Sequence, residues 1–109
     1  MKKLLGNNSK GVIAYGDNVL FSIIQFATLE ISGVDSLVGK GVKMNIAATT
    51  VDVTVTIKVR ANVSCADVAF RVQNNIKRTL ETTTDFKAGK IDVNIIGVEF
   101  KEYKDINVM

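Results

Sequence analysis

Histidine, proline and tryptophan are absent from the chain, and cysteine occurs once, as Cys65. Without histidine, the chain lacks the commonest general base and the commonest metal ligand of proteins. A single cysteine excludes an internal disulfide and a paired-cysteine metal loop, and it fits a reducing compartment. These absences argue against the usual acid–base catalysis and against metal carriage.

Long hydrophobic runs are also missing. No segment reaches the roughly 18 uninterrupted apolar residues of a membrane span, because Gln25, Thr28 and Glu30 interrupt the best candidate. The N-terminal lysines resemble those of a signal peptide, but the apolar run stops after Leu4 and Leu5. An export signal requires an apolar run of roughly 7–15 residues. We therefore expect a cytoplasmic protein without direct membrane insertion.

The totals fit one soluble domain. The chain has 109 residues, of which 47% are hydrophobic and 23% charged, and its net charge is +3. This length supports a single core. We expect an N-terminal tail at residues 1–10, one α+β domain at residues 11–100 and a C-terminal tail at residues 101–109. The mild positive charge permits an acidic partner but does not require one.

Hydrophobic periodicity predicts the elements of the first half. Residues 11–16, GVIAYG, favour a short strand, and the polar pair that follows caps a helix over about residues 17–32, which Gly33 ends. Residues 41–46 alternate as a strand and lead into a polar turn, AATT. In residues 51–60, VDVTVTIKVR, apolar and polar side chains alternate strictly. This pattern is typical of a strand with one buried face.

The second half repeats a helix and a strand. Ser64 and Asp67 form a capping-box pattern, and the helix after them has one apolar side, made of Val68, Ala69, Val72, Ile76 and Leu80. A loop over residues 83–89 precedes a strand from Ile91, and a change of apolar parity beside Gly97 predicts a β-bulge. The order β-α-β-β-α-β favours an α+β, two-layer sandwich with two helices packed on one face of a small sheet.

Two short features, Cys65 and residues 39–43, can each be interpreted as a functional site or as an ordinary structural element. Cys65 lies at or near a helix start, where a thiol can become reactive, but no partner base is visible, so a small residue in a first helical turn is favoured. Residues 39–43, GKGVK, are similar to a phosphate-binding loop, yet they lack its full spacing and its Ser/Thr, and a strand follows. A glycine turn entering that strand is favoured. We expect no catalytic residue, no cofactor and no metal.

RNA binding is the main alternative function, because the RNA-recognition module shares this element order. That module stacks bases on aromatic side chains of its central strands. The expected wet sheet face instead offers Lys43, Asn45, Asp52, Thr54, Thr56, Lys58, Arg60, Asp92 and Asn94. Without aromatics, only weak, sequence-nonspecific phosphate attraction through Lys43, Lys58 and Arg60 remains, and a solvated face is favoured.

Several short motifs follow one another along residues 11–100. They are a glycine-led first strand before Asp17 and Val19; Glu30 and Gly33-Val34 at the end of the first helix; Gly41-Val42; the valine ladder Val51 to Val59; Val68-Ala69, Val72-Gln73, Ile76, Leu80-Glu81 and Thr84; and Val93, Ile95 and Gly97-Val98. In this order the set resembles the alkaline-shock, or envelope-stress-response, proteins of Gram-positive bacteria. The bulky first helix departs from the alanine-rich helix expected of that family.

The resemblance implies a non-enzymatic cytoplasmic protein that responds to stress and has neither cofactor nor catalytic residue. It also implies a location peripheral to the inner face of the cell membrane, held there by an integral-membrane anchor protein. Some members of the family self-assemble, so a homo-oligomer is a further expectation. Nucleic acid is not an expected partner, because the sheet face offers no stacking aromatics.

The first helix carries more apolar side chains than one sheet face covers. With Leu20, Ile23, Ile24, Ala27 and Ile31 placed toward the sheet, Phe21 and Phe26 fall on the flanks and Leu29 points outward. Contiguous exposed apolar area usually marks a contact, although the flanks of such a helix are often half buried. We predict an interaction surface formed by Phe21, Phe26 and Leu29, extended by Phe70 from the second helix.

Overall fold

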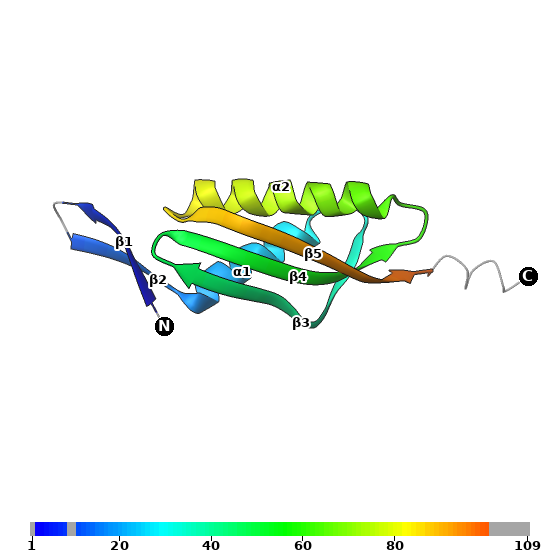
Figure 1. Ribbon diagram of the computed structural model, residues 1–109, viewed down its shortest axis with the longest axis horizontal. Helices are drawn as coiled ribbons and strands as arrows, with labels where there is room; N and C mark the ends of the chain where they lie inside the picture. Colours follow the sequence, from blue (N-terminus) through cyan, green and yellow to red (C-terminus); the bar gives the residue numbers. More distant parts are fainter. Residues whose placement is uncertain (1, 9–10, 101–109) are drawn as a thin grey trace, which may run out of the picture.

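The computed structural model describes residues 2–8 and 11–100, with side-chain detail from Tyr15 onward. Its elements are β1 (Lys2–Asn8), β2 (Gly11–Gly16), α1 (Asp17–Leu29), β3 (Val34–Ala47), β4 (Thr50–Arg60), α2 (Cys65–Thr83) and β5 (Lys87–Glu99). One sheet has the order β3-β4-β5, and a separate two-stranded sheet pairs β1 with β2. Figure 1 shows α1 behind the three-stranded sheet and α2 alongside β5. The predicted α+β class is confirmed.

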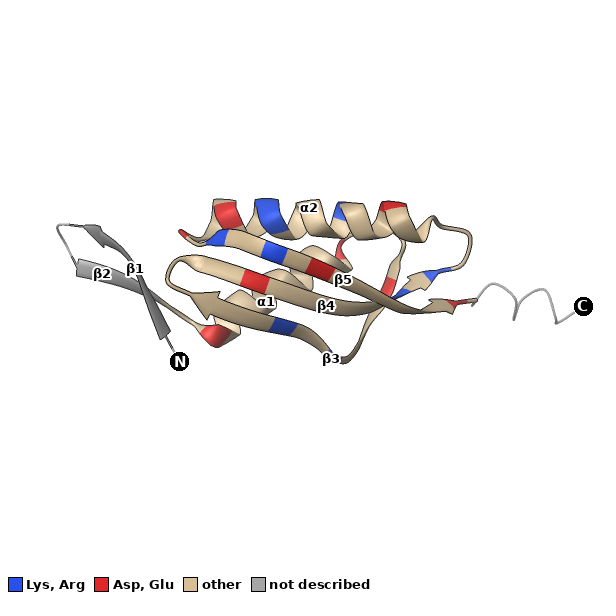
Figure 2. Ribbon diagram, viewed as in Figure 1, with Lys and Arg blue, Asp and Glu red and all other residues tan. Residues whose placement is uncertain are grey.

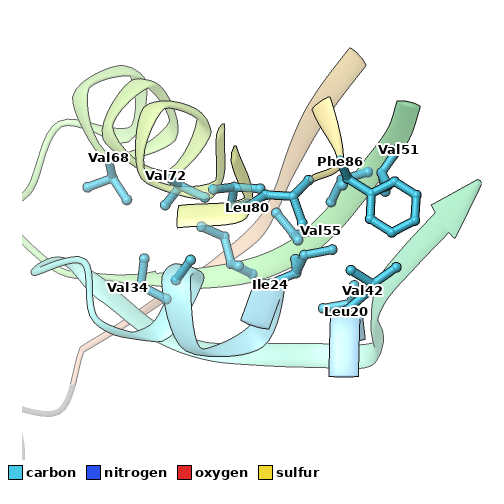
Figure 3. Packing of buried hydrophobic residues seen from close by; sticks show 14 of the residues in the cluster. Leu20, Ile24, Val34, Val42, Val51, Val55, Val68, Val72, Leu80 and Phe86 are labelled. Carbon is cyan, nitrogen blue, oxygen red and sulfur yellow. The ribbon is translucent and has the colours of Figure 1, made fainter. Parts of the chain in front are cut away.

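The centre of the sheet is β4. It pairs antiparallel with β3 and parallel with β5, so α2 forms the crossover that parallel strands require. Its alternation is as predicted, with the odd-numbered side chains from residue 51 to 59 buried. Figure 3 shows how side chains of both helices meet them in one core, made of Leu20, Ile24, Ala27, Val34, Val42, Val51, Val53, Val55, Ile57, Val59, Val68, Val72, Ile76, Leu80 and Phe86.

The N-terminal region differs from expectation. A tail was expected at residues 1–10, but β1 occupies Lys2–Asn8 and pairs antiparallel with β2. In consequence β2 belongs to a hairpin of its own and not to the main sheet. The physical reason is that pairing with β1 satisfies backbone hydrogen-bonding groups of β2 without the main sheet. The expected C-terminal tail at residues 101–109 lies outside the described residues.

The first helix ends at Leu29, before the expected Ser32, because the chain turns tightly through Gly33. The N–H of Val34 donates to the carbonyl of Ile31 at 3.1 Å, and Gly33 has a φ of +103°. A Cβ atom at Gly33 would lie 2.8 Å from Cγ2 of Val68. Only glycine fits both the dihedral angle and this close approach of the turn to α2.

Strand β3 is longer than predicted, because the glycine segment is a bulge inside it. We expected a turn at residues 39–43 and a strand from Gly41, but pairing with β4 already starts at Val34. The register shifts between Leu37 and Val42, where Gly39 and Gly41 have φ values of +63° and +69°. These left-handed dihedrals let the chain insert extra residues without ending the strand.

The turn between α2 and β5 is shorter than the loop expected at residues 83–89. The hydroxyl of Thr84 donates to the carbonyl of Leu80 at 2.8 Å and accepts from the N–H of Phe86 at 3.0 Å. This turn places Phe86 in the core with 1% of its surface exposed, where its ring lies 6.1 Å from that of Tyr15. Strand β5 therefore starts at Lys87 rather than at residue 91.

Two local predictions in the second half are confirmed. The hydroxyl of Ser64 caps α2 by accepting from the N–H of Asp67 at 3.2 Å. The β-bulge beside Gly97 is present, because Ile57 pairs with Ile95 while the next residue of β4 pairs with Gly97. Ile96 is therefore an extra residue in β5, and it lies with 58% of its surface exposed.

Candidate interaction surfaces

The outward side of α1 carries exposed apolar side chains. Phe26 is 66% exposed, Leu29 48% and Val19 47%, and we call these three residues the α1 face. Phe21 differs, because it is half buried and packs against the core. Of the four predicted interface residues, Phe26 and Leu29 thus lie together on this helix in exposed positions, while Phe21 serves mainly the fold.

The buried side of α1 follows the predicted stripe. Leu20, Ile24 and Ala27 have no exposed surface, and Ile23 and Ile31 are half buried. The stripe also includes Thr28, whose hydroxyl donates to the carbonyl of Ile24 at 2.8 Å. That bond satisfies the buried hydroxyl within the helix, so Thr28 can occupy a core position.

A polar junction that the sequence did not reveal joins the two helices. The buried amide nitrogen of Asn75 donates to the carbonyl of Ala27 at 2.8 Å and to the Glu30 carboxylate at 2.6 Å. Its oxygen accepts from Arg78 at 2.8 Å. One turn away along α2, Arg71 donates to the carbonyl of Ser32 at 3.0 Å. The only sequence signal was an asparagine directly before a buried position of α2.

Phe70 does not extend the α1 face, contrary to expectation. It is 61% exposed, but Arg71 and Asn75 mark the side of α2 that contacts the end of α1. At 100° per residue, Phe70 points about 140° away from Asn75. It lies instead on the side of Gln73, whose amide donates to the carbonyl of Ile91 in β5 at 3.0 Å. Phe70 and the α1 face are two separate surfaces.

The face of the sheet opposite the helices is polar. Its exposed or half-buried side chains include those expected for a wet face: Lys43, Asn45, Asp52, Thr54, Thr56, Lys58, Arg60, Asp92 and Asn94. Figure 2 shows charges of both signs along the strands of this face. A hollow of about 250 Å³ near the β3 bulge is lined by Lys40, Lys43 and Ile96, with Val38, Gly39, Gly41 and Thr56. No aromatic ring lines it, so stacking of bases has no platform there.

The remaining chemical candidate is Cys65, which is exposed at the first position of α2. Within residues 15–100, no group of three or more His, Cys, Asp or Glu side chains is placed to hold a metal ion. No helix in the described part of the chain is long and apolar enough to cross a membrane. The molecule is thus a small α+β domain whose most distinctive features are exposed apolar surfaces.

Comparison with known proteins identifies the family. The model of the alkaline-shock protein 23 family, described as having a cell envelope-related function, matches residues 6–100. The chain belongs to this family, as the resemblance of its motifs predicted. It is also similar to the uncharacterised protein YqhY of Bacillus subtilis (strain 168), with 37% identity over 62 residues. That match covers 57% of this chain and 46% of the relative, less than half the relative's length.

Solved structures share the fold at low identity. A variant of MamM CTD in a copper form has a TM-score of 0.64 and 11% identity, and the match covers 77% of this chain and 100% of that one. Another variant, in a nickel form, has a TM-score of 0.63 and 12% identity over 75% of this chain and 99% of that one. At such identity the likeness concerns the fold alone.

Proposed function

We propose that this protein is non-enzymatic and acts at the cytoplasmic side of the cell envelope by binding other proteins through the α1 face. The family's envelope-related description supports the place of action. The observation that carries the contact is the exposure of Phe26 and Leu29, at 66% and 48%, on a helix with charge only near its ends.

The energetics favour a contact at this face. Burying a large apolar side chain contributes roughly 1.5–3 kcal/mol, so Phe26 and Leu29 together supply several kcal/mol to an interface. Contiguous exposed apolar side chains of this kind are typical of contact surfaces. The occupant is a membrane-anchored protein or a second copy of the chain, as the family resemblance implies. A role in the stress response belongs to the same proposal.

The test uses Leu29→Lys, with Asn45→Lys as its control. Both positions are exposed, but Asn45 lies on the sheet face opposite the helices and so away from the α1 face. Leu29→Lys should release the protein from the membrane fraction of its own cells, or shift the purified chain to a smaller species in light scattering. Asn45→Lys should do neither. Unchanged fractionation and unchanged size with Leu29→Lys would exclude the α1 face as the contact.

A further inference from the structure

The two edges of the three-stranded sheet are protected in different ways. An outer strand exposes backbone N–H and C=O groups that can pair with another strand, and natural proteins block such edges. The β3 edge is interrupted by the bulge between Leu37 and Val42 and carries Lys40 and Lys43. Bulges and lysines of this kind keep other strands away.

The first half of the β5 edge is blocked by α2. The Gln73 amide donates to the carbonyl of Ile91 at 3.0 Å, and the Glu81 carboxylate accepts from the N–H of Ala88 at 2.9 Å. The C=O of Ile91 and the N–H of Ala88 point away from β4. Because they already bond side chains of α2, they are not available for hydrogen bonds with another strand.

The second half of the β5 edge is open. Backbone groups alternate along a strand, so Val93 and Ile95 point theirs to the same side as Ile91, away from β4. Among the described residues, no hydrogen bond reaches those outer groups. The neighbouring side chains are apolar and exposed, with Ile96 at 58% and Val98 at 41%. We call residues 93–98 the open β5 edge.

Phe70 overhangs this edge. It precedes Gln73 by three residues on α2 and so shares the side of the helix that lies over β5. Because α2 and β5 run in opposite directions, positions earlier in α2 lie over positions later in β5. This antiparallel course follows from Glu81 contacting Ala88 while Gln73 contacts Ile91. Phe70 therefore lies beyond Ile91, above the unblocked stretch.

We propose that two copies of this chain pair antiparallel along the open β5 edge, around a two-fold axis at Asn94, and form one continuous six-stranded sheet. The proposal goes beyond the function proposed above, because it uses a different surface and stands if the α1 face proves inert. Pairing would satisfy the outer groups of Val93 and Ile95 and cover Phe70 in both copies.

Charge complementarity selects a second copy and its register. With Ile96 as the extra residue, a two-fold at Asn94 sets Val93 opposite Ile95 of the second copy, both on the helix side. It also sets Lys90 of each copy opposite Glu99 of the other, on the sheet face that points away from the helices. The two-fold axis therefore creates this ion pair two times. Inside one chain these residues are about 30 Å apart along the strand.

Neighbouring registers are less favourable. A two-fold at Ile95 would oppose Asp92 to Glu99 of the second copy, and like charges directly opposite each other destabilise a sheet. A two-fold at Val93 would place Lys90 opposite Gly97 and Glu99 opposite Ala88 of the second copy, so neither charge would face an opposite one. The register around Asn94 is therefore the one that the charges favour, and its paired backbone groups are those of Val93 and Ile95, because the C=O of Ile91 already accepts from Gln73.

A disulfide at the axis tests the register directly. The backbone groups of Asn94 point toward β4, so Asn94 and its copy form a non-hydrogen-bonded pair with Cα atoms about 4.5 Å apart. This separation suits a disulfide. In the full chain carrying Cys65→Ser, Asn94→Cys should form a covalent dimer under mild oxidation.

The matched control is Thr56→Cys in the same background. Thr56 is the β4 partner of Asn94 on the same face, but its copy would lie about 14 Å away, three strand spacings across the axis. It should stay monomeric on a non-reducing gel. Equal cross-linking of the two variants, or none with Asn94→Cys at high concentration, would overturn the proposal.

A charge exchange gives a second, independent readout. Lys90→Glu and Glu99→Lys should each weaken dimerisation by about tenfold or more in sedimentation velocity, because each change counts twice at a two-fold. The double variant should restore the wild-type dissociation constant. Arg60, the β4 partner of Glu99, makes thermal unfolding of each variant a necessary control. Failure of the double variant to recover while folded would refute the register.

The experiments distinguish the proposed contact through the α1 face from the proposed pairing through the open β5 edge. Leu29→Lys should leave the cross-linking of Asn94→Cys unchanged, and the charge exchange should leave membrane fractionation through the α1 face unchanged. If Leu29→Lys abolishes all self-association and also the cross-link, the α1 face is the self-contact and the edge pairing is wrong.

Discussion

The side-chain amide of Asn75 donates a 2.8 Å hydrogen bond to the backbone carbonyl of Ala27, forty-eight residues earlier in the chain. Ala27 lies in the last turn of α1, where carbonyl groups lack partners within the helix. Asn75 thus closes the end of one helix from the buried side of the other, while its second donor bond reaches Glu30. The junction fixes α1, and with it the α1 face, against α2.

The first prediction concerns this junction. Asn75→Ala should lower the free energy of unfolding by about 1–3 kcal/mol, because it leaves the buried carbonyl of Ala27 without its side-chain donor. Asn74→Ala, one residue earlier and exposed, should change it by less than about 0.5 kcal/mol. Urea unfolding followed by circular dichroism measures both. Equal effects would show that the junction contributes nothing specific.

The second prediction concerns the turn after α1. Gly33→Ala should destabilise the domain by about 1–3 kcal/mol, since the new Cβ meets Cγ2 of Val68 and the φ of +103° is unfavourable for alanine. Adding Val68→Ala should remove the clash but not the dihedral strain. A double variant less destabilised than the sum of the single changes, measured by denaturant unfolding, would support this division.

Much of this fold is readable from the sequence, and the exceptions share a cause. The alternation of residues 51–59 and the stripe of α2 depend on local period, so both were predicted correctly. The β3 bulge and the place of Phe86 depend on what lies opposite in space, which local period does not encode. The surface residues show the same difference. The exposure of Phe26 could be predicted from the helical period of α1. The separation of Phe70 from the α1 face could not, because it depends on which side of α2 packs against α1.

The third prediction is a pH dependence at Glu81. The ammonium of Lys77, 3.0 Å away, and the N–H of Ala88 hold the pKa of this carboxyl below its ordinary value of 4.5, with a smaller contribution from Lys87. A lowered folded-state pKa means that the contribution to stability is complete above about 4.5 and is lost as the pH falls through the folded-state value. Glu81→Gln should therefore destabilise the domain at pH 7, and this effect should shrink as the pH falls below about 4.5.

Comparing the thermal midpoints of wild type and Glu81→Gln across that pH range measures the difference. Asp85→Asn, at an exposed position just beyond the same helix, serves as the control. A difference that stays constant between pH 7 and pH 3 would show that the carboxylate charge is not involved.

The fourth prediction concerns nucleic acid. Because the outer sheet face mixes Lys43 and Lys58 with Asp52 and Asp92 and offers no stacking ring, binding to RNA or DNA should be weak and without sequence preference. It should disappear with moderate salt in a fluorescence anisotropy titration. Tight, sequence-selective binding that persists at about 200 mM salt would make a nucleic-acid-binding module the better description.

The fifth prediction separates the core of α1 from its exposed face. Ile24 has no exposed surface, whereas Leu29 is 48% exposed on the same helix. Ile24→Lys should unfold the domain, because an unpaired buried charge costs several kcal/mol and small domains have only about 5–15 kcal/mol in total. Leu29→Lys should leave the thermal midpoint within a few degrees of wild type, since the new charge stays in water. Circular dichroism melts of both variants decide the matter, and a large loss of stability with Leu29→Lys would mean that Leu29 supports the fold rather than a contact.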